Sequence, residues 1–211
     1  MTDGVKVLSS TVLHDHVQTH ALLDRMAAQV AALMQSGHPV HLVAAEHPAV
    51  LTEDLSGSPR PWAPWCVLGV LRRGAPLADL LCDKLKSQHG LYPALRLDLQ
   101  VKRYADDLTL LHPETRLQET PEQSHTSLMG YQVLVVDDVL YTGHSLLRVV
   151  NYLLAKGAQS VRLAVLIDRA CATLPVNASV VGATLHIAQG DIIDCHVPPY
   201  EDSLAVHLVK L

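Results

Sequence analysis

Two adjacent acids stand directly after an apolar run of the chain. Residues 133–136 are all apolar and precede Asp137 and Asp138. Such a run is typical of a strand buried on both faces, and ligands of open α/β sheets bind at the C-terminal ends of such strands. Neighbouring carboxylates repel phosphate, but they can accept charge-assisted hydrogen bonds from a vicinal diol. The pair therefore indicates a diol-binding site.

The turn that follows the acids supplies groups suited to phosphate. Gly143 is flanked by the hydroxyls of Thr142 and Ser145, where a helix is predicted to begin. Backbone N–H groups and the helix dipole at such a start favour a bound phosphate. A ligand that carries a phosphate beside a diol is a ribose 5-phosphate. The alternative, in which the acids are turn residues and Ser145 is an ordinary helix cap, fits each element alone but not the ordered set.

The rest of the chain predicts strands that alternate with helices. Apolar side chains spaced close to 3.6 residues apart predict an N-terminal helix over 11–36, capped by Ser9, Ser10 or Thr11. Apolar strands that alternate with helices of about a dozen residues predict an α/β fold with a mostly parallel, doubly wound sheet. The predicted strands are 40–45, 66–70, 95–104, 131–138, 161–168, 192–197 and 204–209, and the further helices are 76–87 and 145–155.

Two segments lack this periodicity. Residues 46–64 are rich in proline and are predicted to form a surface insertion or long loop. Residues 105–130 are polar, and a loop of this length in a compact domain is often a functional lid, so we expect a mobile loop. At roughly 150 residues per domain, the length indicates a single domain over 1–211.

Composition narrows the class of protein. The chain has 211 residues, 49% hydrophobic and 18% charged, with a net charge of −5. This excludes a disordered chain and argues against a non-specific nucleic-acid binder. No apolar run approaches the ~20 residues of a membrane span and no secretory signal is visible, so we expect a cytoplasmic protein that does not bind membranes.

The four cysteines lack C-x-x-C spacing and are interpreted as reduced core residues. His14, His16 and His20 could ligate a metal, but a polar helix face is favoured.

Residues 137–143 resemble the phosphoribosyl pyrophosphate (PRPP) motif of type I phosphoribosyltransferases. The motif has the form found in the PyrR family of pyrimidine-operon regulators and uracil phosphoribosyltransferases. The resemblance runs from about Cys66 to the C-terminus, and it implies the type I phosphoribosyltransferase fold, with helices on both faces of the sheet and a small hood. Further similar segments are 68–74, which resembles the pyrophosphate loop, 104–108 before the mobile loop, and 163–169, 174–175 and 181–182.

The resemblance also implies a role for each part of the site. A Mg²⁺ ion is expected to be held mainly by substrate oxygens, with Asp138 as the protein group that can join it, since Mg²⁺ takes few protein ligands. The resemblance implies that the ribose contacts Asp137 and Asp138, and that the 5′-phosphate contacts Tyr141, Thr142, Gly143, His144 and Ser145. It implies that the pyrophosphate contacts Leu71, Arg72, Arg73 and Gly74, and that the base contacts Asp168 and Arg169. The lid is implied to carry Tyr104, Asp106 and Asp107.

The implied reaction transfers ribose 5-phosphate from PRPP to a nucleobase through an oxocarbenium-like transition state. Enzymes of this class that use 6-oxopurines usually carry an acid at the place of Tyr141, so uracil is favoured, with uridine monophosphate as the product. A structural ion pair or a strand-end cap is an equal alternative for Asp168 and Arg169. A homo-oligomer, dimer or larger, is implied. Two alternative functions stay open, namely a nucleotide-sensing or RNA-binding pyrimidine regulator with little catalysis, and a transferase for another nucleobase.

Some positions depart from the family pattern. Ala105 stands where arginine is usual, which removes a cation that Arg103 or Arg116 could replace. Residues 170–173 read Ala-Cys-Ala-Thr where Gly-His-Arg-Glu is usual. The first helix, which is often rich in arginine in the family, offers only Arg25 here. Each lost cation removes a potential contact with an RNA phosphate, so RNA-controlled attenuation is disfavoured.

Overall fold

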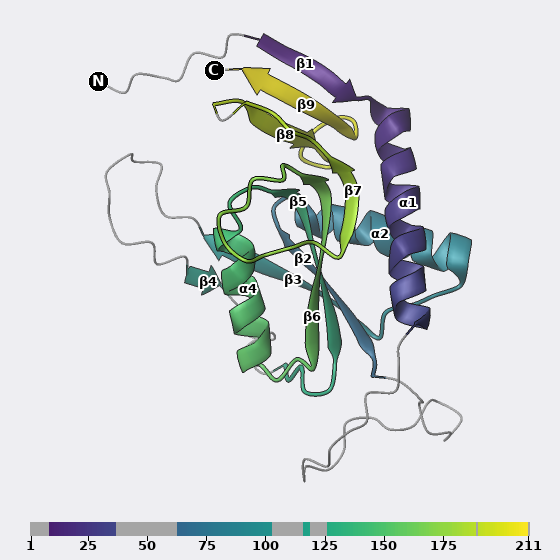
Figure 1. Cartoon of the computed structure of the whole chain (residues 1–211). Helices are drawn as coiled ribbons and strands as arrows, with labels where there is room; N and C mark the ends of the chain where they lie inside the picture. The colour runs from purple at the N-terminus through teal and green to yellow at the C-terminus, as the bar shows by residue number, and fades with distance from the viewer. Residues whose placement is uncertain (1–8, 37–62, 103–115, 119–125, 189, 211) are drawn as a thin grey trace.

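The chain folds around one central sheet with a smaller sheet at one end (Figure 1). The computed structural model describes residues 9–36, 63–102, 116–118, 126–188 and 190–210. The predicted strand 40–45, nearly all of the predicted insertion 46–64 and most of the predicted mobile loop 105–130 lie outside these residues.

The central sheet has six strands, five of them parallel. Residues 133–136 of β5 are at most 1% exposed, as expected for a strand covered on both faces. The short β4 pairs antiparallel with β3 at one edge. The predicted α/β class with a mostly parallel sheet is confirmed. In spatial order the strands are β4 (Arg116–Gln118), β3 (Leu95–Lys102), β2 (Trp65–Leu71), β5 (Gln132–Leu140), β6 (Ser160–Asp168) and β7 (Val180–Thr184).

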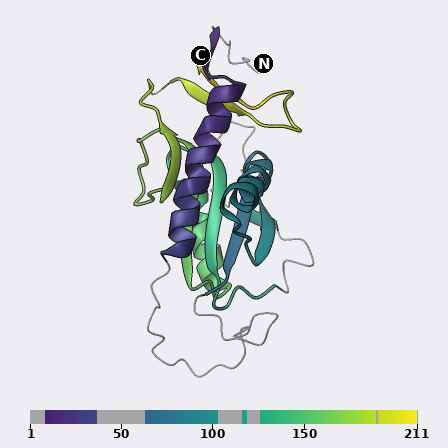
Figure 2. The same cartoon turned by 90° about the vertical axis from the view of Figure 1, so that its right-hand side faces the viewer.

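Helices cover both faces of this sheet. On one face α1 (His16–Gln35) lies beside α2 (Gly74–His89), and together they bury one apolar cluster (Figure 2). On the other face α4 (His144–Ala155) packs over a second cluster. Alternate residues of β5 enter the two clusters, because successive side chains of a strand point to opposite faces.

The first helix begins later than predicted. Residues Ser9–His14 form the strand β1, and Asp15 caps the helix: its carboxylate accepts a hydrogen bond from the Gln18 backbone N–H at 2.9 Å. The Gln18 side chain accepts in return from the Asp15 N–H at 3.0 Å, which completes a capping box. The predicted start at residue 11 is therefore wrong, because the preceding residues satisfy their backbone groups on a distant strand instead.

That distant strand belongs to the small sheet, which we call the hood. It contains β1, β9 (Ala205–Lys210) and β8 (Ile192–His196), all antiparallel. The two C-terminal strands match the predicted ones, and the hood that the resemblance implied is present. The turn between β8 and β9 contains a cis peptide bond between Pro198 and Pro199.

The cysteines are free, but not all of them are in the core. Cys66 and Cys195 are buried, Cys82 is half-buried and Cys171 is exposed. Burial raises the pKa of Cys66 to about 12, so its thiol stays protonated. The prediction of four core cysteines is wrong for Cys171, because it lies in an irregular connection after β6 rather than in a regular element.

No helix in the described part of the chain is long and apolar enough to cross a membrane.

Candidate active site

A cavity of about 240 Å³ opens where β5 ends and α4 begins. Its walls contain Asp137 and every member of the predicted phosphate turn. Asp138 does not line this cavity. Its charge acts on Arg73, and the charges of both acids act on Cys195. The two adjacent acids thus differ in their neighbours at the end of β5, where Asp137 lines the cavity and the charge of Asp138 acts on Arg73.

Both carboxylates are fixed by the backbone that follows them. The Asp137 Oδ1 atom accepts a hydrogen bond from the Asp138 N–H at 2.9 Å, and the Asp138 Oδ1 atom accepts one from the Val139 N–H at 2.9 Å. Asp137 is 8% exposed, whereas Asp138 is half-buried. A buried, hydrogen-bonded carboxylate of this kind is preorganised to accept further hydrogen bonds from a polar ligand.

Gly143 shapes the phosphate turn. It is the N-cap of α4 and has a left-handed backbone with φ of 87°, which glycine adopts without strain. Among the described residues no side chain caps this helix, so Ser145 does not have the capping role of the alternative interpretation. The His144 ring lies 3.0 Å from the Thr142 hydroxyl, and the Thr142 carbonyl accepts from the Thr173 N–H at 3.2 Å. The turn is therefore held in shape by its own side chains and by the connection after β6.

The predicted pyrophosphate loop is packed directly on the acidic strand end. Residues 71–74 join β2 to α2, and the peptide bond between Leu71 and Arg72 is cis. A methyl group at Gly74 would overlap the Val136 carbonyl and lie 3.1 Å from the Asp137 Cα atom. Only a glycine allows this close approach, so the backbone of the loop lies directly against the end of β5.

The hood contacts both arginines of the loop. The Arg72 guanidinium lies 4.7 Å from the centre of the Tyr200 ring. Arg73 donates from Nη2 to Glu201 at 2.6 Å and forms an ion pair with Asp194 at 3.0 Å. Burial opposes the charged form of Arg73, but the hydrogen bond to Glu201 and the nearby carboxylates raise the pKa of its guanidinium. These three hood residues were not predicted as part of the site.

The predicted base contacts lie next to the phosphate turn but differ in their surroundings. The Arg169 guanidinium stacks 4.1 Å above the Tyr141 ring and is 7% exposed. Its Nε atom is buried and has no hydrogen-bond partner in the described part of the chain. Asp168 accepts from the Ala170 N–H at 2.7 Å, so it caps the end of β6, one of the two structural alternatives considered for this pair. Arg169 is the member of the pair that contacts Tyr141, a residue that lines the cavity.

The predicted lid residues Tyr104, Asp106 and Asp107 lie outside the described residues, as do Arg103 and Ala105. Their roles stay predictions.

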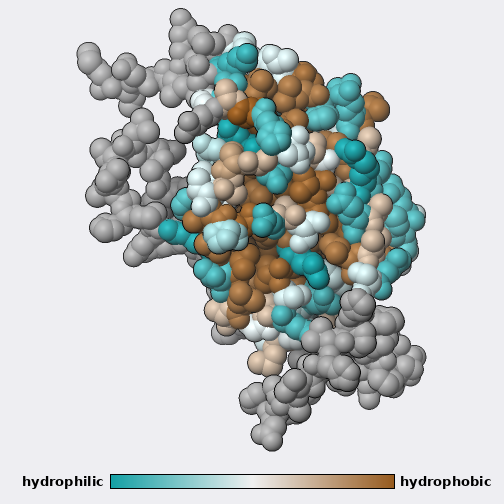
Figure 3. All heavy atoms as spheres, viewed as in Figure 1, coloured by the Kyte–Doolittle hydropathy of each residue, from teal (hydrophilic) through white to brown (hydrophobic). Residues whose placement is uncertain are grey.

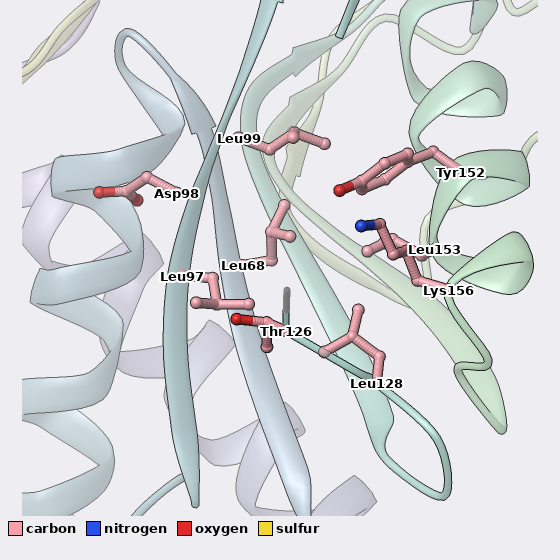
Figure 4. Close-up of a pocket in the computed structure, with 9 residues that line it drawn as sticks. All are labelled: Leu68, Leu97, Asp98, Leu99, Thr126, Leu128, Tyr152, Leu153 and Lys156. Atoms are coloured by element: carbon pink, nitrogen blue, oxygen red, sulfur yellow. The ribbon is translucent and has the colours of Figure 1, made fainter. Parts of the chain in front are cut away.

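A second hollow, under α4, is too small for a substrate (Figure 4). It holds only about 10 Å³, roughly the space of one water molecule. It is lined by Leu68 of β2, Leu97 of β3 and Leu153 of α4. The side chain of Asp98 points away from it toward α2 (Figure 4).

Two stacked histidines extend the hood network and should make stability depend on pH. His196 lies 3.1 Å from Asp194, and its ring stacks on that of His207 at 4.0 Å. Burial and the charge of His196 lower the pKa of His207 below its usual value of 6.5. The unfolded chain then binds more protons than the folded chain, so the free energy of unfolding should fall as pH drops below about 6.5.

Urea denaturation at pH 7.5 and pH 5.5 checks this expectation. Replacing His207→Gln should reduce the fall without removing it, because the pKa of His20 is lowered as well, mainly by burial. An identical pH dependence in the wild type and in this variant would contradict the assignment to His207.

Comparisons with known proteins agree with this geometry. A phosphoribosyl transferase domain model matches residues 10–203. A protein named "Bifunctional protein PyrR" from Clostridium acetobutylicum is 29% identical over 147 residues, which cover 69% of this chain and 80% of that protein. The protein of the same name from Deinococcus radiodurans is 36% identical over 129 residues, which cover 60% of this chain and 68% of that protein.

Solved structures show the same fold at low identity. The hypoxanthine phosphoribosyltransferase of Trypanosoma cruzi superimposes with a TM-score of 0.64 at 16% identity, covering 95% of this chain and 96% of that one. The enzyme of the same name from Staphylococcus aureus superimposes with a TM-score of 0.59 at 15% identity, covering 91% of this chain and 86% of that one. The fold is that of a type I phosphoribosyltransferase. The chain belongs to the phosphoribosyl transferase domain family, and within it is close to the PyrR proteins.

Proposed function

We propose that this phosphoribosyltransferase joins uracil to the ribose 5-phosphate of PRPP and releases uridine monophosphate and pyrophosphate. The observation that carries the proposal is the contact of the pyrophosphate loop with the acidic strand end at Gly74 and Asp137. This contact sets the loop that carries Arg72 and Arg73 against the strand that carries the acids and leads to the phosphate turn, which supports a site for PRPP.

Each part of the substrate has a complementary surface. The 5′-phosphate would accept hydrogen bonds at the turn 141–145, where the N-terminus of α4 faces the cavity. The ribose hydroxyls would donate to Asp137 and Asp138 at the strand end. The pyrophosphate would lie against residues 71–74, whose arginines balance its several negative charges. Fixed dipoles and charges of this kind stabilise the charge that redistributes in the transition state.

The donor set also fits Mg²⁺. Asp138 is a hard oxygen ligand on the side that faces Arg73, beside the proposed pyrophosphate position. In the described part of the chain no cluster of three or more His, Cys, Asp or Glu side chains could enclose a metal ion. The proposed ion takes most of its ligands from substrate and water, with Asp138 as its protein contact. When bound, Mg²⁺ would neutralise part of the charge on the leaving group.

Two features support uracil as the acceptor. Tyr141 carries a phenol where 6-oxopurine enzymes usually carry a carboxylic acid. Arg169 stacks on Tyr141 and offers N–H donors that suit the carbonyl groups of a pyrimidine. The PyrR relatives lend further support, whereas the structural neighbours named above are hypoxanthine enzymes that share the fold at low identity.

A substrate panel tests the choice of base. Purified protein is mixed with PRPP, Mg²⁺ and one of uracil, hypoxanthine, guanine, xanthine or orotate, and pyrophosphate release is measured. We expect release with uracil and little with the other bases. Turnover with a purine instead would overturn the uracil assignment but not the transferase.

A regulator of pyrimidine genes is the second candidate, favoured by the name "Bifunctional protein PyrR" that the relatives carry. Arg25 argues against RNA binding at the first helix, since its guanidinium donates to the Gly182 carbonyl at 3.0 Å. A submicromolar, salt-sensitive affinity for a pyrimidine-leader hairpin would favour the regulator. So would retained uridine nucleotide binding without turnover of any base.

We further propose a cytoplasmic homo-oligomer. Apolar side chains gather on the surface over α4 and the adjoining strands (Figure 3), where Met129 and Leu154 are each 50% exposed. A second copy of the chain could cover such a face.

A further inference from the structure

The hood holds Arg73 with more than one acid. Glu201 accepts from Nη2 at 2.6 Å and faces Nε at 3.5 Å, so it meets the guanidinium along one edge. Asp194 contacts the same Nη2 atom at 3.0 Å from the adjacent strand. The three side chains are between 19% and 33% exposed, which limits screening by water.

Glu201 is itself fixed in place. Its Oε2 atom accepts a hydrogen bond from the Val197 N–H at 2.7 Å across the turn between β8 and β9. Burial opposes its ionisation, but the hydrogen bonds from Arg73 and Val197 hold the pKa of the carboxyl below its usual value. Glu201 is therefore a charged, preorganised partner for Arg73 near neutral pH.

This arrangement conflicts with the use of Arg73 for pyrophosphate. The edge formed by Nη2 and Nε is one that binds phosphate oxygens in a bidentate manner, and Glu201 already occupies it. The charges of the two hood carboxylates and of Asp138 all act on Arg73. A polyanion that approaches Arg73 must displace or outweigh these acids.

We propose that Asp194 and Glu201 form a carboxylate clamp that holds Arg73 on the hood and competes with pyrophosphate for its guanidinium. The inference rests on the proposed function, because it concerns the pyrophosphate end of the same substrate site. Binding of pyrophosphate draws Arg73 away from the clamp and frees the turn 197–201 from the loop. The clamp thereby weakens binding of PRPP and pyrophosphate, which also favours product release.

Charge-neutral variants test the clamp by isothermal titration with inorganic pyrophosphate at one fixed Mg²⁺ concentration. Asp194→Asn and Glu201→Gln should each tighten pyrophosphate binding by about three- to tenfold, the range for removing one charged partner of a half-buried arginine. Glu201→Gln keeps an oxygen that can accept from Val197. Uridine monophosphate, which has no pyrophosphate, should bind the variants and the wild type equally.

Asp202→Asn is the matched control. It removes the same charge from an exposed position in the same turn and has no contact with Arg73. In an Arg73→Ala background, Asp194→Asn should no longer tighten pyrophosphate binding. Unchanged or weaker pyrophosphate binding in both clamp variants, or equal tightening in Asp202→Asn, would overturn the clamp.

The outcomes separate the clamp from the proposed function. If the wild-type chain binds neither pyrophosphate nor PRPP, the proposed function fails and the clamp fails with it. If the wild type binds both and turns over a base while the clamp variants match it, only the clamp fails.

Discussion

Replacing Asp137→Asn should lower kcat/KM for PRPP by about 10- to 150-fold, the effect of losing one charge-assisted hydrogen bond to the ribose. Asp137 is nearly buried and lines the cavity at the end of β5. The amide can still accept from the Asp138 N–H, so the local backbone should be retained. Steady-state kinetics at varied PRPP concentration measures the loss, and circular dichroism checks that the variant is folded.

Asp83→Asn provides the control for this variant. Asp83 is exposed on α2, away from the cavity at the end of β5, and its replacement removes the same charge. Its kinetics should match the wild type. If Asp137→Asn also retained wild-type kinetics, the assignment of the ribose to this strand end would be wrong.

Replacing Gly74→Ala is expected to reduce both stability and activity. The added methyl group would overlap the Val136 carbonyl, so the loop and β5 must separate. Overpacking of this kind costs about 1–3 kcal/mol of the free energy of unfolding. Because alanine favours helices more than glycine does, a loss at this first residue of α2 would come from the steric conflict. Urea denaturation measures stability, and kcat/KM for PRPP should fall with the displacement of Arg72 and Arg73 from Asp137.

Gly190→Ala is the matched glycine control, since an added methyl group there meets no described atom within 4 Å. We expect it to leave stability and kinetics close to those of the wild type. Equal stability and activity in Gly74→Ala would mean that the close contact between loop and strand is not needed.

Four strands of the central sheet, namely β2, β3, β5 and β6, could be predicted because their signal is local. The apolar run 133–136 and the following acids specify a strand buried on both faces whatever the rest of the chain does. The helix predicted over 145–155 is present as α4, His144–Ala155, and Gly157 with φ of 89° follows its C-cap. These elements carry most of the residues predicted for the site, and the roles of those residues stay predictions.

The elements that were missed depend on contacts between distant parts of the chain. β1 pairs with β9, for example Ser9 with Lys210, and nothing near residue 9 signals that partner. β7 is short, and its Gly182 must pack against the Leu166 carbonyl of β6, a requirement that only the assembled sheet creates. Sequence patterns describe local structure, and these strands are stabilised by pairing across the fold.

The same reason explains the part of the site that was missed. Arg72 and Arg73 were predicted from their motif, but their partners Tyr200, Glu201 and Asp194 carry no motif of their own. They reach the loop only because the hood folds back over the end of β2.

A crystal structure with bound ribose 5-phosphate tests the central claim most directly. We expect the phosphate to lie on the backbone N–H groups of residues 142–145 and the ribose hydroxyls to lie within hydrogen-bond distance of Asp137 and Asp138. Sugar bound in another cavity, or bound here with both carboxylates turned away from it, would contradict the account.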